Sequence, residues 1–452
     1  MPVLHATSAL TPEGWKSDVR VTVEGSVIAS IQTDASAHEG DERHAIMAPA
    51  AANLHSHAFQ RAMAGLAEIR GKETDTFWTW RETMYRFALM MSPEDVEAVA
   101  AQLYVEMLEA GFASVAEFHY LHHSPDGSPY GEPAEMAARI VYAAGRAGIG
   151  MTLLPVFYAH STFGGAPPRP EQRRFISDLE TFARIVADCR GMVRGGAVGV
   201  APHSLRAVTP SELSQLVSLA GDGPIHIHAA EQIKEVEDCV ASLGVRPVRW
   251  LIDHAGVDAR WCLVHATHMD EGETGDLARS GAVAGLCPVT EANLGDGIFN
   301  AADYIGAGGR YGVGADSNVS IGVAQELRQL EYAQRLRERA RNVCAPPGAS
   351  CGRTMLEAIW LGGAQALKRN SGKLAPGATA DIVTFRADHP TLAGKADDQV
   401  LDAWVFSAGN SLVDCVWSDG LKVVVGGRHL FRDEIAGQFS RTMRELAGRT
   451  PP

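Results

Sequence analysis

Apolar and polar residues alternate at both ends of the chain in the pattern that predicts short β-strands. Residues 19–23 alternate between valine and polar side chains, a Glu-Gly-Ser turn follows, and the apolar run 27–31 returns along the first strand, which is a hairpin pattern. The runs 380–385 and 421–427 have the same character. We therefore expect the two ends to share one small β domain, with the rest of the chain inserted between them.

The middle of the chain instead repeats a short apolar strand followed by a stretch of helical periodicity. Helical stretches cover residues 93–111, 133–148, 171–189 and 211–220. The predicted strands end near His57, His119, Tyr158, His203, His228, His265, Cys287 and Asp316. Eight strand–helix repeats over about 320 residues predict an α/β fold, a (β/α)8 barrel of the TIM type.

These patterns divide the chain into two predicted domains. Residues 49–370 form the barrel, while residues 1–48 and 371–452 together form a small β-sandwich domain with a C-terminal tail. Hydrophobic residues make up 46% and charged residues 21% of the 452, a composition typical of a folded globular protein. No run of 18 apolar residues occurs, so we expect no transmembrane helix.

The charge and the cysteines narrow the choice of partner and compartment. The chain has 40 Lys and Arg against 54 Asp and Glu, a net charge of −14, which disfavours nucleic acid and anionic membranes as partners. The N-terminus lacks the basic start and apolar stretch of a signal peptide. The seven cysteines are scattered without a Cys-x-x-Cys pair, as expected for reduced thiols. We therefore expect a cytoplasmic protein.

The predicted strand ends carry a candidate metal site. His55 and His57 form a His-x-His pair, and their side chains point the same way because side chains alternate along a strand. His228 ends the fifth strand and Asp316 the eighth. Alone, each could be an ordinary core or turn residue. Because strand ends meet at one face of a TIM barrel, we expect these four residues to bind one divalent metal ion. Zinc suits the set best, and iron or manganese would also fit.

Two further residues at strand ends are candidates for proton transfer. Glu231 lies just past the end of the fifth strand, where it could hydrogen-bond a substrate without ligating the metal, although it could also be a helix N-terminal acid. His265 closes the sixth strand. Together with Asp316, which could accept a proton from water, these are the predicted catalytic residues.

The order of these residues resembles the amidohydrolase superfamily, in its subgroup with a single metal. The run 371–383 resembles that superfamily's return into its small β domain. Longer strings resemble one family within it, the formimidoylglutamate deiminases: Asn53–Glu68, Phe77–Glu82, Ala116–Tyr120, His203–Pro210, Leu263–His268 and Thr290–Phe299.

This resemblance implies an activity and a set of substrate contacts. The activity is hydrolysis of N-formimidoyl-L-glutamate, a linear amidine with two carboxylates, to N-formyl-L-glutamate and ammonia in histidine degradation. The family's substrate contacts correspond to Gln60, Arg81, Tyr120, His203 and Arg206. Arginine suits a carboxylate because its guanidinium donates two parallel hydrogen bonds.

Two other functions stay open at this point, and so does the oligomeric state. A deaminase of guanine, cytosine or a triazine would use the same metal residues, but such pockets favour aromatic stacking, whereas two arginines favour carboxylates. A non-catalytic barrel is the less favoured alternative because no ligand is missing. We also expect a homodimer, for which the predicted helix over residues 325–341 is a candidate interface.

Three details complete these expectations. Ala50 stands after Pro49 where the superfamily usually has glycine, which could alter the turn before the first ligand pair. Asn318 stands where the family has histidine, so a contact near Asp316 could differ. We interpret the pair 122–123, two histidines, as solvated loop residues.

Overall fold

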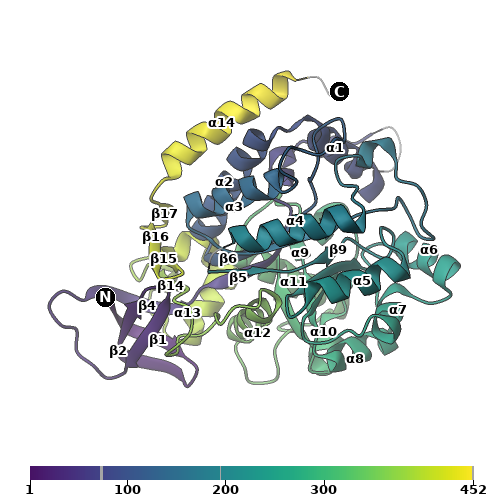
Figure 1. Cartoon of the computed structure of the whole chain (residues 1–452). Coiled ribbons are helices and arrows are strands. Elements are labelled where there is room, and N and C mark those ends of the chain that lie inside the picture. The colour runs from purple at the N-terminus through teal and green to yellow at the C-terminus, as the bar shows by residue number, and fades with distance from the viewer. Residues whose placement is uncertain (72–74, 194, 450–452) are drawn as a thin grey trace.

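The computed structural model describes residues 1–71, 75–193 and 195–449, and Figure 1 shows a sheet of strands from both chain ends beside a larger α/β part. The strands of this sheet lie in the order β17-β16-β15-β14-β4-β1-β2-β3. Their bounds are β1 Val3–Thr11, β2 Gly14–Glu24, β3 Val27–Gln32, β4 Glu42–Pro49, β14 Ile382–Phe385, β15 Val413–Ser418, β16 Leu421–Val425 and β17 Arg428–His429. The two ends therefore form one β unit, as their alternation predicts.

The sheet joins the two ends and then curls back on itself. β14 pairs antiparallel with β4, which makes the direct link between the C-terminal and N-terminal strands. Ile28 N donates to Ala378 O at 2.9 Å, and an isolated bridge joins Val27 to Thr379. These bonds bring β3 against the segment before β14. The apolar side chains enclosed by the curl, such as Val21 and Trp417, are buried.

The larger part contains two parallel sheets, β5-β6-β7-β8 and β10-β11-β12-β13, with β9 paired to β7. Their bounds are β5 Ala51–Ser56, β6 Phe112–His119, β7 Gly150–Phe157, β8 Ala197–Val198, β9 Ala201–Pro202, β10 Ile225–Ala229, β11 Trp261–His265, β12 Val283–Leu286 and β13 Arg310–Val313. Bridges link the two sheets at both junctions, from Val200 to Ile225 and from Ser56 to Asp316. The predicted TIM-type α/β fold is confirmed, whereas the exact domain boundaries stay a prediction.

Helices surround these sheets (Figure 1). Their bounds are α1 Phe77–Met90, α2 Pro93–Glu109, α3 Glu135–Ala147, α4 Leu179–Met192, α5 Pro210–Ala220, α6 Ile233–Leu243, α7 Pro247–His254, α8 Glu271–Ser280, α9 Pro288–Leu294, α10 Ala301–Gly306, α11 Val323–Glu338, α12 Cys351–Ala366, α13 Asp398–Ala403 and α14 Arg432–Gly448. In α11, Leu327 and Leu330 are buried, while Leu336 is 80% exposed. A homodimer through this helix stays a prediction.

One predicted helix is wrong over its first half. The stretch 171–189 begins with a short 3-10 turn, and α4 starts only after Asp178, whose side chain caps the helix by accepting from Thr181 N. Between them, Ile176 bridges to Tyr158. Arg174 is fully buried and donates to Met91 O at 2.8 Å, just after α1 ends. These contacts with distant parts of the chain keep residues 173–178 out of a helix despite their helical periodicity.

The interpretation of His122 and His123 as solvated residues is also wrong. Both are buried, and their Nε2 atoms lie 2.8 Å from Val156 O and 2.7 Å from Ile176 O. Each ring therefore satisfies a backbone carbonyl inside the fold, a role that the sequence does not reveal.

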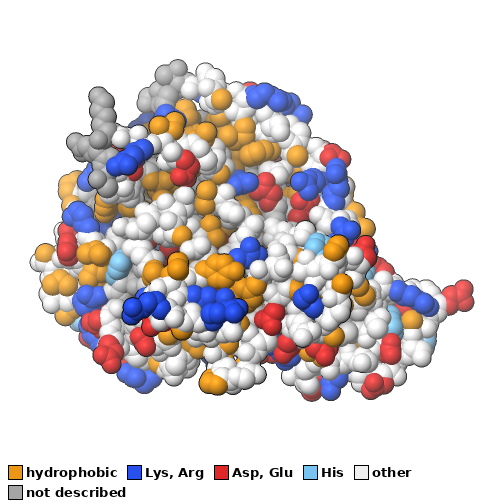
Figure 2. All heavy atoms as spheres, turned by 180° about the vertical axis from the view of Figure 1, so that it is seen from behind, with side chains coloured by type: hydrophobic (Ala, Val, Ile, Leu, Met, Phe, Trp, Pro, Cys, Tyr) orange, Lys and Arg blue, Asp and Glu red, His pale blue; other side chains and the backbone are white. Residues whose placement is uncertain are grey.

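Charged side chains of both signs are spread over the surface. Figure 2 shows Lys and Arg side chains intermingled with Asp and Glu side chains over one face, so the acidic excess is not gathered there. Among the described residues, no helix combines the length and the apolarity needed to cross a membrane.

A buried ion pair joins the α/β part to the β sheet. Arg369, which follows α12, places its Nη2 3.4 Å from Asp381 Oδ2 and 2.5 Å from Asp419 Oδ1. The side chain of Arg369 is 4% exposed and that of Asp381 is 1% exposed. Burial raises the pKa of Asp381 to about 6, although Arg369 opposes that rise. The guanidinium therefore compensates a carboxylate that would be costly to bury alone.

We predict that Arg369→Met lowers the free energy of unfolding by about 3–5 kcal/mol, because it leaves the buried acid uncompensated. The matched control is Arg386→Met, whose ion pair with Asp388 is exposed and should contribute about 0–1 kcal/mol. Parallel urea titrations followed by tryptophan fluorescence measure both. Equal losses in the two variants would contradict the role given to the buried pair.

Candidate active site

The four predicted metal residues lie together at the strand ends of the α/β part. One side-chain nitrogen or oxygen from each of His55, His57, His228 and Asp316 lies within 4.8 Å of those of the others, and all four residues are buried. His55 Nε2 is 3.2 Å from His57 Nε2 and 3.1 Å from His228 Nε2. Asp316 Oδ1 is 3.4 Å from His55 Nε2 and 3.2 Å from His57 Nε2. Four residues that are far apart in the sequence therefore form one compact cluster.

Backbone carbonyls fix how two of these rings present their nitrogens. His57 Nδ1 lies 2.9 Å from Phe118 O, and His228 Nδ1 lies 3.0 Å from His203 O. A carbonyl oxygen only accepts, so each Nδ1 carries a hydrogen, and in a neutral ring Nε2 then presents a lone pair. Both lone pairs face His55 and Asp316.

These converging acceptors fit a cation. Burial lowers the pKa of His55 to about 3 and holds that of His228 well below its ordinary value. The lone pairs on Nε2 of His57 and His228 thus converge beside the carboxylate of Asp316. Three histidine nitrogens and one carboxylate oxygen are a ligand set that divalent zinc takes in proteins. The cluster is therefore chemically suited to hold a divalent metal ion.

A second group of titratable side chains lies next to the cluster. His265 Nε2 is 3.6 Å from Glu231 Oε1 and 3.9 Å from Asp316 Oδ2, and His265 Nδ1 is 3.3 Å from Glu291 Oε1. Burial alone would lower the pKa of His265, but the three surrounding carboxylates raise it to about 10. Burial raises the pKa of Glu231, an effect that the charges of His265 and Arg206 oppose. These groups can hold and exchange protons at the pocket.

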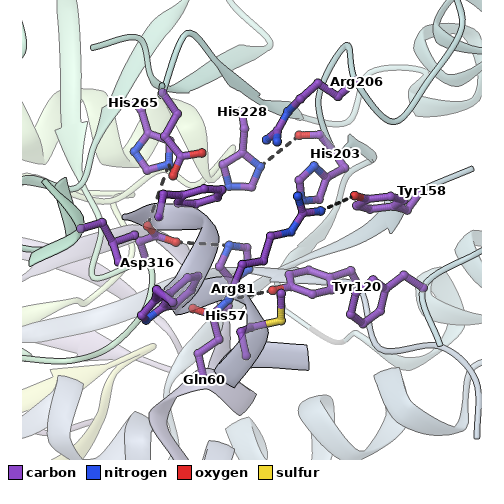
Figure 3. A pocket seen from close by; sticks show the side chains of 16 residues that line it. His57, Gln60, Arg81, Tyr120, Tyr158, His203, Arg206, His228, His265 and Asp316 are labelled. Carbon is purple, nitrogen blue, oxygen red and sulfur yellow. Dashed lines mark hydrogen bonds and ion pairs between the residues drawn. The ribbon is translucent and has the colours of Figure 1, made fainter. Parts of the chain in front are cut away.

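Figure 3 shows the pocket that these residues share with the predicted substrate contacts. Its lining residues are His57, Gln60, Phe77, Trp80, Arg81, Met84, Tyr120, Tyr158, Phe175, His203, Arg206, His228, Glu231, His265, Leu294 and Asp316. The structure therefore brings every predicted site residue to one place. Of the predicted residues, only His55 does not line the pocket; it is fully buried, and its Nε2 contacts His57 and His228.

Two arginines make one end of the pocket cationic. Arg81, on α1, donates from Nη2 to Tyr158 Oη at 2.8 Å, and Arg206, after β9, is buried with its Nε unpartnered. Both guanidinium carbons lie near the ring centroid of Trp78, at 5.7 Å and 5.8 Å. Within the described part of the chain, neither forms an ion pair with Asp or Glu. Their charges are thus free to bind an anion.

Neutral polar groups complete the pocket wall. Gln60 Nε2 donates to Tyr120 Oη at 2.7 Å, which leaves the buried Gln60 Oε1 without a partner. Burial, and then the charges of Arg206 and Arg81, hold the pKa of His203 well below its ordinary value. His203 is therefore a neutral group at the cationic end.

Two residues that contact the site, Tyr158 and Glu291, are not among the predicted site residues. Tyr158 lines the pocket, and its position at a predicted strand end was the available signal. Glu291 accepts from Cys287 N at 2.9 Å through the same Oε1 that lies near His265. It lies on the short helix α9, and the sequence pattern carries no signal that this helix points back to β11.

The two departures from the family pattern have structural explanations. Ala50 needs no left-handed backbone, and its N–H donates to Asp381 O at 3.0 Å. Asn318 is fully buried, and its Nδ2 lies 3.2 Å from Ser56 Oγ, 3.0 Å from His57 O and 2.9 Å from Asp316 O. Asn318 thus ties the backbone of two predicted ligands together.

Comparison with known proteins places these features in a family. The amidohydrolase family matches residues 46–423, and the N-terminal domain of formimidoylglutamate deiminase HutF matches residues 1–45. A formimidoylglutamate deiminase of Pseudomonas aeruginosa is 49% identical over 451 residues, which cover 99% of this chain and 100% of the relative.

Two further proteins extend this similarity. A 5-methylthioadenosine/S-adenosylhomocysteine deaminase of Natronomonas pharaonis is 28% identical over 397 residues, covering 86% of this chain and 84% of the relative. The crystal structure of an amidohydrolase from Brucella melitensis superposes with a TM-score of 0.96 at 55% identity, covering 99% of this chain and 100% of that one.

We predict that Asn318→Gly weakens divalent metal binding by about 10–100-fold, as is usual when a group that orients a metal ligand is lost. Glycine retains the left-handed backbone of this residue, whose φ is 57°, so the change isolates the side chain. Competition with a chromogenic chelator measures the affinity. The matched control is Asn342→Gly, an exposed asparagine with φ 55°. Equal affinities in the two variants would contradict the prediction.

Proposed function

This chain belongs to the amidohydrolase family, and we propose that it hydrolyses N-formimidoyl-L-glutamate to N-formyl-L-glutamate and ammonia. The observation that carries this proposal is the polarity of the pocket. One end holds the cluster of histidines and Asp316, and the other holds Arg81 and Arg206, which form no ion pair with Asp or Glu in the described part of the chain. A linear amidine with two carboxylates matches both ends. The similarity to a curated formimidoylglutamate deiminase along the whole chain supports the same substrate.

We propose that His55, His57, His228 and Asp316 hold one divalent metal ion per subunit, with Zn²⁺ as the first choice. Such an ion, when bound, lowers the pKa of water to near neutrality and so supplies the nucleophile. The fixed Nδ1–H groups of His57 and His228 support this assignment because they keep both Nε2 lone pairs pointing into the cluster.

The chain's own residues then handle protons and orientation in the proposed reaction. Water adds to the formimidoyl carbon, the bond from that carbon to the terminal nitrogen breaks, and ammonia leaves. Asp316 is placed to accept a proton from the attacking water. Glu231 and His265, 3.6 Å apart and both lining the pocket, are placed to hold the amidine and to protonate the leaving nitrogen. Positioned proton transfer of this kind contributes about 10²–10⁴-fold to rate.

The opposite end of the pocket orients the substrate by its carboxylates. We propose that Arg81 and Arg206 bind them, with Gln60, Tyr120 and His203 as further contacts. A net charge of −14 repels a net anion at long range, so the binding energy has to come from these local donors.

The cellular setting is part of the same proposal. We propose a cytoplasmic homodimer that works in histidine degradation on a small-molecule substrate, without nucleic acid or a membrane as partner. Two observations support parts of this setting. All seven cysteines are free and buried, as suits a reducing compartment, and Leu336 on α11 leaves an apolar side chain exposed for a partner.

The substrate prediction is tested by a coupled ammonia assay on N-formimidoyl-L-glutamate, guanine and cytosine, with bound zinc quantified. We expect ammonia from the glutamate compound only, because the free guanidinium charges have no counterpart on a nucleobase. Turnover of guanine or cytosine, without turnover of N-formimidoyl-L-glutamate, would contradict the proposal and indicate a nucleobase deaminase instead.

Two variants separate metal binding from proton transfer. Glu231→Gln should keep the metal and lower turnover by about 10²–10⁴-fold, since the amide keeps the shape but cannot take up a proton. His228→Ala should lose the metal, which elemental analysis of the purified protein detects. Ammonia release near the wild-type rate by Glu231→Gln would show that this carboxylate is not required.

A further inference from the structure

The hydroxyl group of Tyr158 lies in the pocket with both of its acceptor positions filled. Tyr158 follows β7 and lines the pocket beside His203, with 4.6 Å between the two ring centroids. Its oxygen accepts from Arg81 Nη2 at 2.8 Å and from Gln172 Nε2 at 2.9 Å. Figure 3 shows the guanidinium of Arg81 directed at this hydroxyl.

The donors in this arrangement are fixed by chemistry. A guanidinium has no acceptor, so Arg81 can only donate to Tyr158. Gln172 is oriented by its other end, because its Oε1 accepts from Arg169 N at 2.8 Å. Its Nε2 therefore has to be the atom that faces Tyr158. Both contacts deliver a hydrogen to the phenolic oxygen.

The hydroxyl proton of Tyr158 consequently has to point to a third group. A phenol has two lone pairs and one hydrogen, and both lone pairs are used. No acceptor for that hydrogen lies within hydrogen-bond distance among the described residues. The neighbouring cationic groups, Arg81 and Arg206, favour an anionic acceptor at this place.

We infer that Tyr158 is a substrate-binding residue that donates its hydroxyl hydrogen to a carboxylate of the substrate, alongside Arg81. This inference rests on the proposed function and adds a specificity determinant to it. A hydrogen bond to an ionised acceptor is roughly twice as strong as a neutral one. The hydroxyl therefore selects for a carboxylate over a neutral group of the same size.

The inference is tested by Tyr158→Phe with three compounds. N-Formimidoyl-L-glutamate has both carboxylates, N-formimidoyl-L-2-aminobutyrate lacks the side-chain carboxylate, and N-formimidoyl-4-aminobutyrate lacks the α-carboxylate. Steady-state ammonia release gives kcat/KM for each. Where turnover is too slow to follow, the Ki of the compound as a competitor takes its place.

We expect Tyr158→Phe to lower kcat/KM for N-formimidoyl-L-glutamate by about 10–100-fold, chiefly through KM. For the compound that lacks the bound carboxylate, wild type and variant should be nearly equal. A similar loss for all three compounds would overturn the inference, because the hydroxyl would then serve no carboxylate.

Tyr85→Phe is the matched control for indirect effects. The hydroxyl of Tyr85 also accepts a hydrogen bond from Gln172 Nε2, at 3.4 Å. The centroid of its ring lies 5.2 Å from the guanidinium carbon of Arg81, yet Tyr85 does not line the pocket. We expect this variant to treat the three compounds as the wild type does. An equal loss in Tyr85→Phe would assign the effect to displaced Arg81 and overturn the inference.

Different results would contradict the proposed function and the role of Tyr158. A wild-type protein that releases no ammonia from N-formimidoyl-L-glutamate would contradict the proposed function itself. A wild type that releases ammonia, with a Tyr158→Phe variant whose circular dichroism and activity are both unchanged, would contradict only the role of Tyr158.

Discussion

The convergence of three imidazoles and one carboxylate is the constraint on which the rest of the site depends. A cation can bind there only if the proposed ligands all present their acceptor atoms to one point, so the protein has to hold these side chains in one orientation. It does so with nearby backbone groups: Phe118 O, on β6, sets the ring of His57, and His203 O, just past β9, sets that of His228. The amide of Asn318 holds the chain at Asp316. The backbone therefore positions the proposed ligands and also fixes the tautomers of His57 and His228.

The pocket separates charge along its length. Carboxylates and histidines gather at the end with the proposed metal ligands, where Glu231, Glu291 and Asp316 surround His265. The other end is cationic, with Arg81 and Arg206 near the ring of Trp78. The proposed substrate carries a cationic amidine and two carboxylates, so this field favours one orientation of it. In an acidic protein, such a local field favours the binding of a net anion that the chain repels at long range.

Local patterns in the sequence were sufficient to predict the fold class and the residues at the strand ends of the site, whereas the resemblance to a family supplied the substrate contacts Gln60, Arg81, Tyr120, His203 and Arg206. The His-x-His pair at residues 55–57 needs only the alternation of a strand, and the strand–helix repeat places distant strand ends together. The helix start at Leu179 was missed because Phe175 and Arg174 are drawn inward by partners far along the chain. His122 and His123 were misplaced for the same reason, since their carbonyl partners are non-local.

The remaining gaps also concern non-local geometry. Tyr158 and Glu291 contact the site through groups that only the folded structure brings near them. The central claim is that one metal ion sits among the four ligands, and anomalous diffraction from crystals of the purified protein tests it most directly. Data on either side of the zinc absorption edge should show one peak per chain between His55, His57, His228 and Asp316. A chain with full N-formimidoyl-L-glutamate turnover and no anomalous peak there, at the zinc, iron or manganese edge, would contradict the account.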